Sequence, residues 1–188
     1  MARNMVEVSA VPKEDLGDLV GLWVAAKVDA GVPLEVATRF ANDGRFESAI
    51  QRADVNAHLA RIDGRPVGYV LTSENPFGLN PEPEVAVEQL YVDPTARRHG
   101  VARSLLCAVV GHAERSGSDV IVSNVPTQSR EAHRFFARLG FSSVVVRRVV
   151  STTQLRRRLA PQGSAINTAV DQLIRRRRSL RSIGTRAS

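Results

Sequence analysis

The segment from residue 85 to residue 122 limits the fold of this chain more than any other part of the sequence. Residues 85–92 are mostly apolar, as in a buried strand, and a tight polar turn follows them. A helix with strong apolar periodicity is predicted from Gly100 to about Arg115, and residues 120–122 form a second short apolar run. A strand, a helix and a strand of this length can form a right-handed crossover between two parallel strands. The chain is therefore predicted to be a mixed α/β protein.

The elements around this segment are predicted from hydrophobic periodicity and from turn residues. The clearest of them is a hairpin, because Asp63-Gly64 stands between two apolar runs. The full set consists of strands over 6–10, 58–62, 66–71 and 141–150, and of helices over 12–31, within 33–52 with Gly44 as an interruption, and over 129–139.

The positive charge of the chain is concentrated at its C-terminal end. The net charge is +7, yet residues 1–150 carry 17 Lys and Arg against 18 Asp and Glu, while residues 151–188 carry nine Arg against the single Asp171. We therefore expect a nearly neutral domain over 1–150 and an Arg-rich tail over 151–188, partly helical or disordered. Three interpretations of the tail stay open: a solubilising end, an arm that contacts nucleic acid or another polyanion, and a helix over 165–181 that docks on the body or on a second copy in a homodimer.

Features that the sequence lacks exclude several classes of protein. Cys107 is the single cysteine, so an intrachain disulfide is impossible. No apolar run approaches the ~20 residues that span a bilayer, and the N-terminal residues do not resemble a signal peptide. The expectation is a cytoplasmic protein with no membrane span. The four histidines show no metal-ligand spacing, so no metal site is expected.

The strongest candidate for a binding site is the turn before the helix that begins at Gly100. The first backbone N–H groups of a helix have no partner within it and lie at the positive end of its dipole, so such junctions bind phosphate. Gly100 and Ala102 leave the main chain open to close approach, and four basic residues surround the turn: Arg97, Arg98, His99 and Arg103. The alternative is a solvated turn before an ordinary helix. The pattern is neither G-x-G-x-x-G nor a P-loop, which disfavours dinucleotide oxidoreductases and NTPases.

At this turn the sequence resembles the GNAT superfamily of acetyl-CoA-dependent N-acetyltransferases. The family signature, Gln/Arg-x-x-Gly-x-Gly/Ala after a strand and opening a helix, is matched by Arg97, Gly100 and Ala102. Residues 90–94 resemble the family's fourth strand and its exit, and residues 134–141 resemble its closing helix-to-strand element. The two separated motifs stand at the spacing that the family shows.

The resemblance implies a GNAT-like acyl-CoA N-acyltransferase fold, whose mixed sheet is splayed between two parallel strands, here 85–92 and 119–124. The thioester of acetyl-CoA would lie in the cleft between these strands. The main chain of residues 90–92 would pair with the pantetheine arm, and the main chain of residues 98–103 would hold the pyrophosphate. The implied cofactor-binding residues are Leu90, Tyr91, Val92, Arg97, Arg98, His99, Gly100, Val101, Ala102, Arg103 and Ser129, the last where the family often places an Asn that contacts the cofactor.

The family's reaction also calls for a general base. An amine with a pKa near 10 is protonated at pH 7, which opposes its attack by about 4 kcal/mol. Glu84 and Glu88 share one face of the strand with Ala86, where some family members place a catalytic glutamate. Glu88 is the predicted base because it lies nearer the acetyl position, and its alternative role is a cross-strand ion pair. Phe136 stands where many members carry a tyrosine that protonates the leaving thiolate, and phenylalanine has no proton to donate.

The resulting expectation is an acyltransferase that moves an acetyl group from acetyl-CoA to a primary amine of a small molecule or protein, by direct attack. The alternative is a catalytically silent acyl-CoA-binding module of the same fold, with a basic tail that contacts nucleic acid. The intact turn motif fits both, and Phe136 slightly favours the second. An amine acceptor is the partner that the first interpretation requires.

Overall fold

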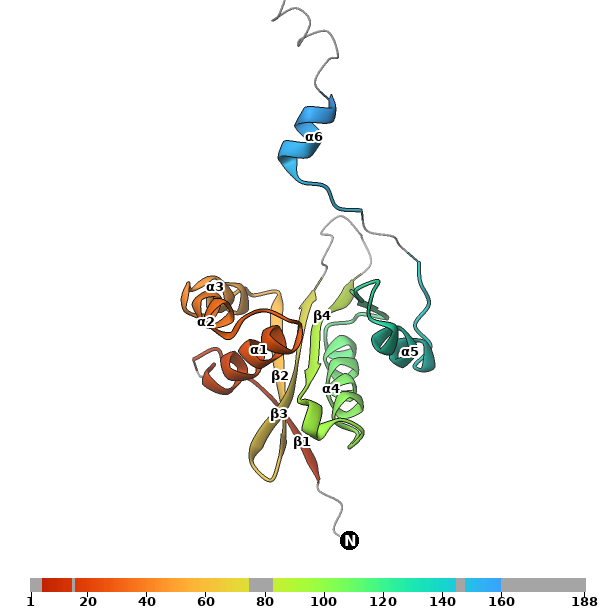
Figure 1. Ribbon diagram of the computed structural model, residues 1–188. Helices are drawn as coiled ribbons and strands as arrows, with labels where there is room; N and C mark the ends of the chain where they lie inside the picture. Colours follow the sequence, from red (N-terminus) through yellow and green to blue (C-terminus); the bar gives the residue numbers. More distant parts are fainter. Residues whose placement is uncertain (1–4, 15, 75–82, 145–147, 160–188) are drawn as a thin grey trace, which may run out of the picture. The chain divides into compact units, whose positions relative to one another are not determined.

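The computed structural model describes residues 5–14, 16–74, 83–144 and 148–159 of the chain (Figure 1). The chain divides into a compact unit over Met1–Phe141 and a second unit over Ser142–Ser188. The boundary predicted at residue 150 stays a prediction. The tail helix expected between residues 165 and 181 lies outside the described residues. Within the described ranges, no helix has the length and apolar character that crossing a membrane requires.

A five-stranded mixed sheet forms the centre of the first unit, in the order β1-β2-β3-β4-β5. Neighbouring strands are antiparallel from β1 to β4, whereas β4 and β5 are parallel. The predicted crossover from residue 85 to residue 122 is therefore confirmed. The strands are β1 (Val6–Ala10), β2 (Val55–Ile62), β3 (Arg65–Glu74), β4 (Glu84–Val92) and β5 (Val120–Ser123).

The predicted hairpin joins β2 to β3. Asp63 and Gly64 both have positive φ, 52° and 77°, as a two-residue turn with the twist of the flanking strands requires. The hairpin sets Ile62 opposite Arg65, and after one register shift between Arg61 and Ala60 the pairing runs on to Val55 opposite Ser73.

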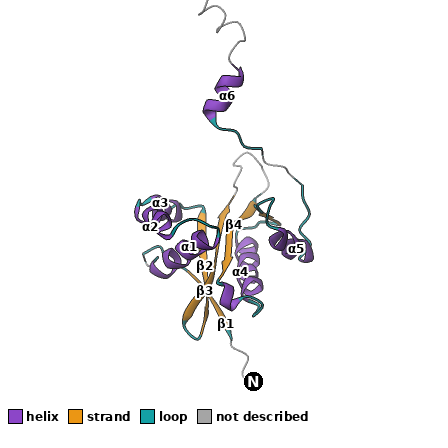
Figure 2. Cartoon of the chain, viewed as in Figure 1, coloured by secondary structure: helices purple, strands orange, loops and turns teal. Residues whose placement is uncertain are grey.

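Helices cover both faces of the sheet (Figure 2). The predicted helix within 33–52 is two helices, because Gly44 adopts a left-handed conformation with φ 75° between them. Three helices lie on one face: α1 (Gly17–Asp29), α2 (Leu34–Asn42) and α3 (Arg45–Ile50). The crossover helix α4 (Val101–Arg115) lies on the other face, and α5 (Arg130–Arg138) follows β5.

Two apolar clusters bind these layers together. One joins Leu19, Leu22 and Trp23 of α1 to the near face of β2 and β3. The other joins α4, through Leu105 and Val109, to the opposite face of the sheet. Trp23 is 7% exposed and packs on Phe46 with ring centroids 4.6 Å apart, as expected of a core residue.

The strand predicted over 141–150 is wrong for the part that the structure describes. Residues 141–144 and 148–150 form no strand, and Val144 and Val149 are almost fully exposed. β-branched residues favour strands where a neighbouring strand covers them, and here they have no such neighbour. A 3-10 turn, η1 (Pro94–Ala96), follows β4. The last described α-helix, α6 (Thr152–Leu159), belongs to the second unit and has no buried residue.

His58 of β2 is buried between the sheet and α4. Burial lowers its pKa, as do the nearby charges of His112 and Arg115. Below a pH of about 6.5, the unfolded chain protonates His58 and the folded chain resists protonation, so the free energy of unfolding should fall as the pH decreases. Urea unfolding at pH 7.5 and 5.5 measures this loss, which should be smaller in His58→Gln and unchanged in the exposed control His133→Gln. Equal losses in the wild type and His58→Gln would contradict the assignment.

Candidate active site

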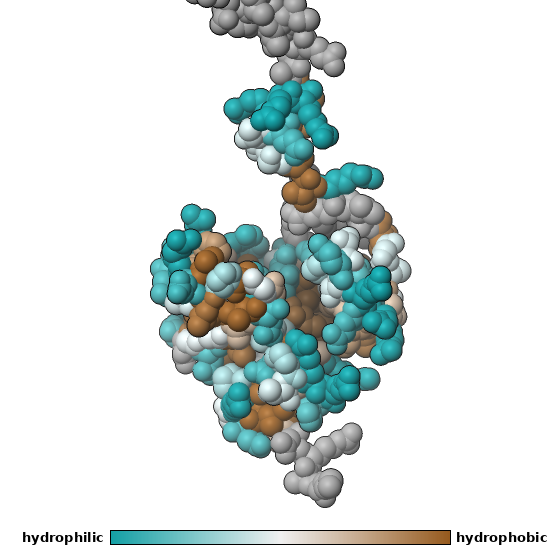
Figure 3. All heavy atoms as spheres, in the orientation of Figure 1, coloured by the Kyte–Doolittle hydropathy of each residue, from teal (hydrophilic) through white to brown (hydrophobic). Residues whose placement is uncertain are grey.

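A cleft opens in the sheet where β4 separates from β5. The parallel pairing runs from Glu84 opposite Val120 to Val87 opposite Ser123, and the last bond joins the Asn124 N–H to the Val87 carbonyl at 3.4 Å. Beyond this point, within the described residues, the outer edge of β4 has no strand partner. Figure 3 shows a hollow with hydrophobic atoms at its floor between the α1 side and the α4 side of the molecule.

A β-bulge in β4 lies at the start of the cleft. Leu71 of β3 pairs with Gln89 and the next residue, Thr72, pairs with Val87, which leaves Glu88 as an extra residue. A bulge of this kind bends its strand and increases the local twist. The bulge therefore coincides with the point at which β4 turns away from β5.

The bulge also changes which β4 residues face each layer of helices. Val85 and Val87 face α4, and so do Leu90 and Val92, whereas Tyr91 packs on the α1 side. The two residues of the bulge both point to the α1 side: Glu88 bonds Ser73, and Gln89 accepts from the Tyr69 hydroxyl at 3.0 Å.

The predicted pantetheine partners lie along the open edge of β4. Leu90, Tyr91 and Val92 pair with β3 on one side, and their other edge faces the cleft. An edge of this kind offers N–H and C=O groups to a further strand, and here the Val92 carbonyl already accepts from Arg97 Nε. Gly68, opposite Val92 on β3, keeps this region close-packed, because a Cβ there would lie 2.7 Å from the Tyr91 carbonyl oxygen and 3.2 Å from Val101 of α4.

The predicted pyrophosphate site is the N-terminus of α4. Gly100 is the N-cap with φ 83°, and no side chain caps the helix. Arg98 is also left-handed, with φ 67°. The first N–H groups of α4 are therefore available to an anion. Of the remaining predicted residues, Val101 is buried in the core, Ala102 is half-buried, and His99 and Arg103 are exposed.

Arg97 directs its side chain away from this turn. Its Nε donates to the Val92 carbonyl at 3.2 Å, and its Nη2 lies 3.9 Å from Asp29 Oδ2. The same carboxylate oxygen accepts from the Tyr91 hydroxyl at 2.9 Å. Burial raises the pKa of Tyr91, and the Asp29 carboxylate raises it further, so the phenol stays a donor. The Arg97 side chain thus ties the turn to α1, which leaves its main chain as the part that can contact a phosphate.

Glu88, the predicted base, is held at the mouth of the cleft by two neutral donors. Ser73 Oγ lies 2.6 Å from Glu88 Oε1, and Asn124 Nδ2 lies 3.3 Å from Glu88 Oε2. The side chain is otherwise exposed. Among the described residues no ion pair to Glu88 occurs within 4 Å, which disfavours the alternative role as a cross-strand ion pair.

Sequence reasoning missed Ser73 and Asn124. Ser73 pairs with Ala86 and reaches Glu88 from the neighbouring strand, and Asn124 reaches it from the end of β5. Neither position belongs to a motif. The one available signal is the polar residue Asn124 directly after an apolar strand.

Ser129 and Phe136, the two positions at α5 that the sequence singled out, have different surroundings. Ser129 is the N-cap of α5, where the sequence placed it, and its side chain makes no capping bond. Phe136 is buried and packs edge-on against Phe135 and Phe141, with ring centroids 5.3 Å and 5.0 Å away. Phe136 therefore fills an aromatic cluster.

Solved structures share this fold. A ribosomal-protein-alanine N-acetyltransferase from Brucella melitensis biovar Abortus 2308 superposes with a TM-score of 0.64 at 20% identity, over 78% of this chain and 98% of that one. An aminoglycoside acetyltransferase, HMB0005, from an uncultured soil metagenomic sample gives 0.67 at 19% identity, over 79% and 99%. The aminoglycoside N-acetyltransferase AAC(6')-Iy in complex with CoA gives 0.59 at 22% identity, over 78% and 93%. At these identities the likeness establishes the fold alone.

Sequence comparison extends the likeness to the family. A curated relative, the uncharacterized N-acetyltransferase MJ1207 of Methanocaldococcus jannaschii, is 26% identical over 132 residues, which are 70% of this chain and 58% of that protein. The chain thus spans little more than half the length of this relative. The profile of the acetyltransferase (GNAT) family matches residues 13–141, which contain the bulge, the cleft and the N-terminus of α4. The resemblance read from Arg97, Gly100 and Ala102 is confirmed, and the chain belongs to the GNAT acetyltransferase family.

Proposed function

We propose that this chain transfers an acetyl group from acetyl-CoA to a primary amine by direct attack of the amine on the thioester. One observation carries the proposal: a single open strand edge leads from Glu88 to the turn before the uncapped N-terminus of α4. From residue 88 to residue 92 this edge spans roughly 13 Å at 3.3 Å per residue. It joins a carboxylate at one end to the helix terminus that would hold the pyrophosphate at the other.

The residues present fit acetyl-CoA as a co-substrate. The main chain of Leu90, Tyr91 and Val92 would pair with the amide groups of the pantetheine arm, as an added strand does. The main chain of residues 98–103 would hold the pyrophosphate, with Ser129 at the α5 terminus as a further contact. Bound there, acetyl-CoA supplies an activated acyl group, and the chain supplies its alignment.

Glu88 would take the proton of the amine, directly or through a water. Its carboxylate is oriented by Ser73 and Asn124 and stays open to the cleft. Phe136 cannot donate a proton to the sulfur of the leaving CoA thiolate. A thiol with a pKa near 8.5 can depart as the thiolate and take its proton from solvent.

The decisive experiment measures thiol release from acetyl-CoA in the presence of a panel of amines. Solved proteins of this fold are named for aminoglycosides and for a ribosomal-protein alanine, so the panel includes aminoglycosides, N-terminal peptides and simple diamines. Amine-dependent thiol release supports the proposal. Thermal stabilisation by CoA without release of thiol from any amine would instead support the silent acyl-CoA-binding module.

The basic tail gives a second candidate function, contact with nucleic acid. In its described part, α6 exposes Arg156, Arg157 and Arg158. The full chain should bind duplex DNA with an affinity that falls about 10²–10³-fold between 50 and 200 mM salt, as expected for roughly four to six phosphate contacts. Removing residues 161–188 should flatten this salt dependence and leave acetyl transfer to small amines unchanged, as measured by fluorescence anisotropy and the thiol assay.

The opposite result would contradict tail binding to nucleic acid: no DNA binding at low salt, together with a changed oligomeric state or a lower melting temperature after truncation. It would mean that the tail packs on protein. A changed oligomeric state would support the homodimer that the sequence left open, and a lower melting temperature alone would support docking of the tail on the body.

A further inference from the structure

The last residue of α1, Asp29, carries a carboxylate where a helix disfavours negative charge. The carbonyl end of a helix is the negative end of its dipole, so an acidic side chain there destabilises the helix. The Asp29 side chain is 38% exposed, so water compensates this effect in part. Partners outside α1 are therefore expected to hold the carboxylate in place.

Two side chains from outside α1 approach the same carboxylate oxygen. The Tyr91 hydroxyl donates to Asp29 Oδ2 at 2.9 Å, and Arg97 Nη2 lies 3.9 Å from this atom. Tyr91 belongs to β4, and Arg97 lies in the turn between β4 and α4. A single oxygen of Asp29 thus connects α1 to both segments that would hold the co-substrate.

Arg97 extends this connection to the open edge of β4. While its Nη2 faces Asp29, its Nε donates to the Val92 carbonyl at 3.2 Å. The planar guanidinium presents its N–H groups in a fixed fork, so the two contacts determine one orientation of the side chain. A carbonyl oxygen has two lone pairs, which leaves the Val92 carbonyl able to accept a second hydrogen bond.

The pairing of β3 with β4 shows which main-chain groups lie at that edge. The Asp93 N–H donates to the Val67 carbonyl at 2.8 Å, so these two residues form a hydrogen-bonded pair. Along an antiparallel strand such pairs alternate with pairs whose main-chain groups point away from the partner strand. Leu90 and Val92 therefore direct their N–H and C=O groups into the cleft, whereas Tyr91 directs its own toward β3.

We propose that Asp29 is a positioning residue for the co-substrate. Through Tyr91 and Arg97 it fixes the Val92 carbonyl and the turn before α4 in the geometry that binds CoA, and it does not touch CoA itself. Ordering these groups before binding reduces the entropy that binding costs. The inference rests on the proposed function, because that function places the pantetheine arm and the pyrophosphate at these two segments.

Charge alone predicts the opposite effect of Asp29. CoA is an anion, so removing a nearby carboxylate should tighten its binding if electrostatic attraction decides the affinity. Asp29→Asn keeps the size of the side chain and can still accept from Tyr91, but it loses the charge that attracts Arg97. If Asp29 acts by positioning, this variant should bind CoA about 3–10-fold more weakly, because binding then has to order one more side chain.

Arg97→Lys makes the same distinction from the other partner. Lysine keeps the positive charge but lacks the fork that reaches the Val92 carbonyl and Asp29 at once. The variant should therefore also bind CoA about 3–10-fold more weakly. Because Asp29 and Arg97 act through one contact, the double variant should lose little more than either single variant.

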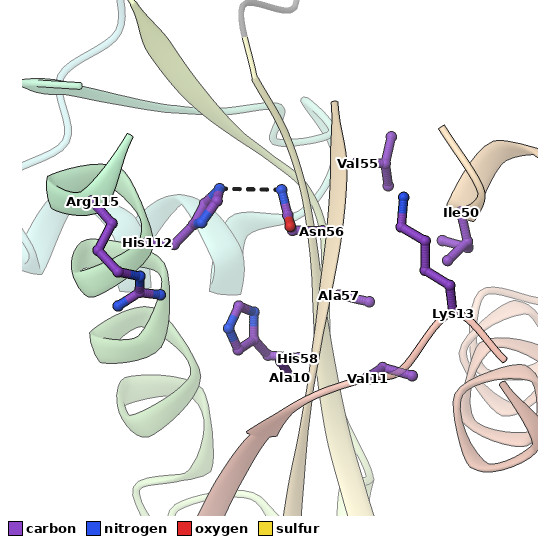
Figure 4. A pocket seen from close by; sticks show the side chains of 10 residues that line it. All are labelled: Ala10, Val11, Lys13, Ile50, Val55, Asn56, Ala57, His58, His112 and Arg115. Atoms are coloured by element: carbon purple, nitrogen blue, oxygen red, sulfur yellow. Dashed lines mark hydrogen bonds between the residues drawn. The ribbon is translucent and has the colours of Figure 1, made fainter. Parts of the chain in front are cut away.

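Two control variants alter similar contacts away from the proposed site. Asp18→Asn removes the carboxylate at the other end of α1, which lies 2.6 Å from Arg61 of β2. Asn56→Ala removes a contact between the sheet and the far end of α4, where the Asn56 amide nitrogen lies 3.2 Å from His112 Nε2 (Figure 4). Both should lower the melting temperature and leave the affinity for CoA unchanged. Asp29→Asn should do the reverse, because the loss of its half-exposed ion pair is offset by relief at the helix end.

Isothermal titration calorimetry of the full chain with CoA, at constant ionic strength, measures these affinities. The Nε–H resonance of Arg97, in protein labelled with ¹⁵N at arginine, reports the contact directly in the absence of CoA. It should move in Asp29→Asn and stay in place in Asp18→Asn. In steady-state kinetics, Asp29→Asn should raise the KM for acetyl-CoA more than it lowers kcat.

Two results would overturn the positioning role. One is an affinity for CoA in Asp29→Asn that equals or exceeds that of the wild type. The other is a pair of losses, in Asp29→Asn and Arg97→Lys, that add in the double variant. Either result, with CoA bound by the wild type, leaves the proposed function standing. A wild-type chain that binds no CoA contradicts the proposed function, and the positioning role with it.

Discussion

Replacing Gly100 with glutamate is expected to abolish the thermal stabilisation of the chain by CoA. The substitution places a carboxylate beside the N–H groups of α4, where it occupies the positive end of the helix and repels a pyrophosphate. The loss of several such favourable terms, about 3 kcal/mol or more, corresponds to at least roughly 100-fold weaker binding. Differential scanning fluorimetry with increasing CoA measures this loss.

Gly44→Glu is the matched control for this variant. Gly44 is also a helix N-cap with positive φ, 75° against 83° for Gly100, and a Cβ at either position meets nothing within 4 Å. Both variants therefore carry the same left-handed strain, about 1–2 kcal/mol. Gly44→Glu should lose stability and keep its response to CoA. Undiminished CoA affinity in a folded Gly100→Glu protein would remove the basis of the proposed function.

Glu88→Gln is expected to lower kcat by about 10²–10⁴ if Glu88 is the general base. Glutamine retains the size of the side chain and can still accept from Ser73, but it cannot take the proton of the amine. The affinity for acetyl-CoA should change little, because main-chain groups hold the co-substrate in this proposal. Steady-state kinetics and CoA binding on the same preparations separate the two effects.

Two further variants show how Glu88 acts. Ser73→Ala removes the donor to Oε1 and should lower kcat by a smaller factor, with little change in the KM for acetyl-CoA. Glu84→Gln alters the other carboxylate on the same strand and should retain most of the activity. A large loss in Glu84→Gln, with an unaltered pH–rate profile in Glu88→Gln, would move the role of base to Glu84.

The sequence alone predicted the secondary structure of the segment that carries the candidate site, because the signals in that segment are local. The run before Asp93, the cap at Gly100 and the periodicity of α4 are each visible within a few residues. The topology rule for parallel strands then supplied the crossover. The Asp63-Gly64 hairpin was predictable for the same reason.

Features that depend on pairing were not predictable in this way. Residues 141–150 have a high strand propensity, but in the described part a strand fails to form because no partner covers it. The bulge at Glu88 is a property of the register between β3 and β4, which no motif in β4 encodes. The contacts of Ser73 and Asn124 with Glu88, and that of Arg97 with Asp29, join residues far apart in the sequence, so no local pattern reveals them.

The extra residue in β4 affects how regular the sheet of this chain can be. A version that lacked Glu88 would keep Val85, Val87, Leu90 and Val92 on the α4 side and Tyr91 on the α1 side, because only the doubled position disappears. Its β4 would run straight beside β3, and β5 could follow it further. The shorter chain would have the more regular sheet but would lack both the bend at the start of the cleft and the carboxylate beside it. A regular sheet and an open cleft are therefore opposing demands on this one residue.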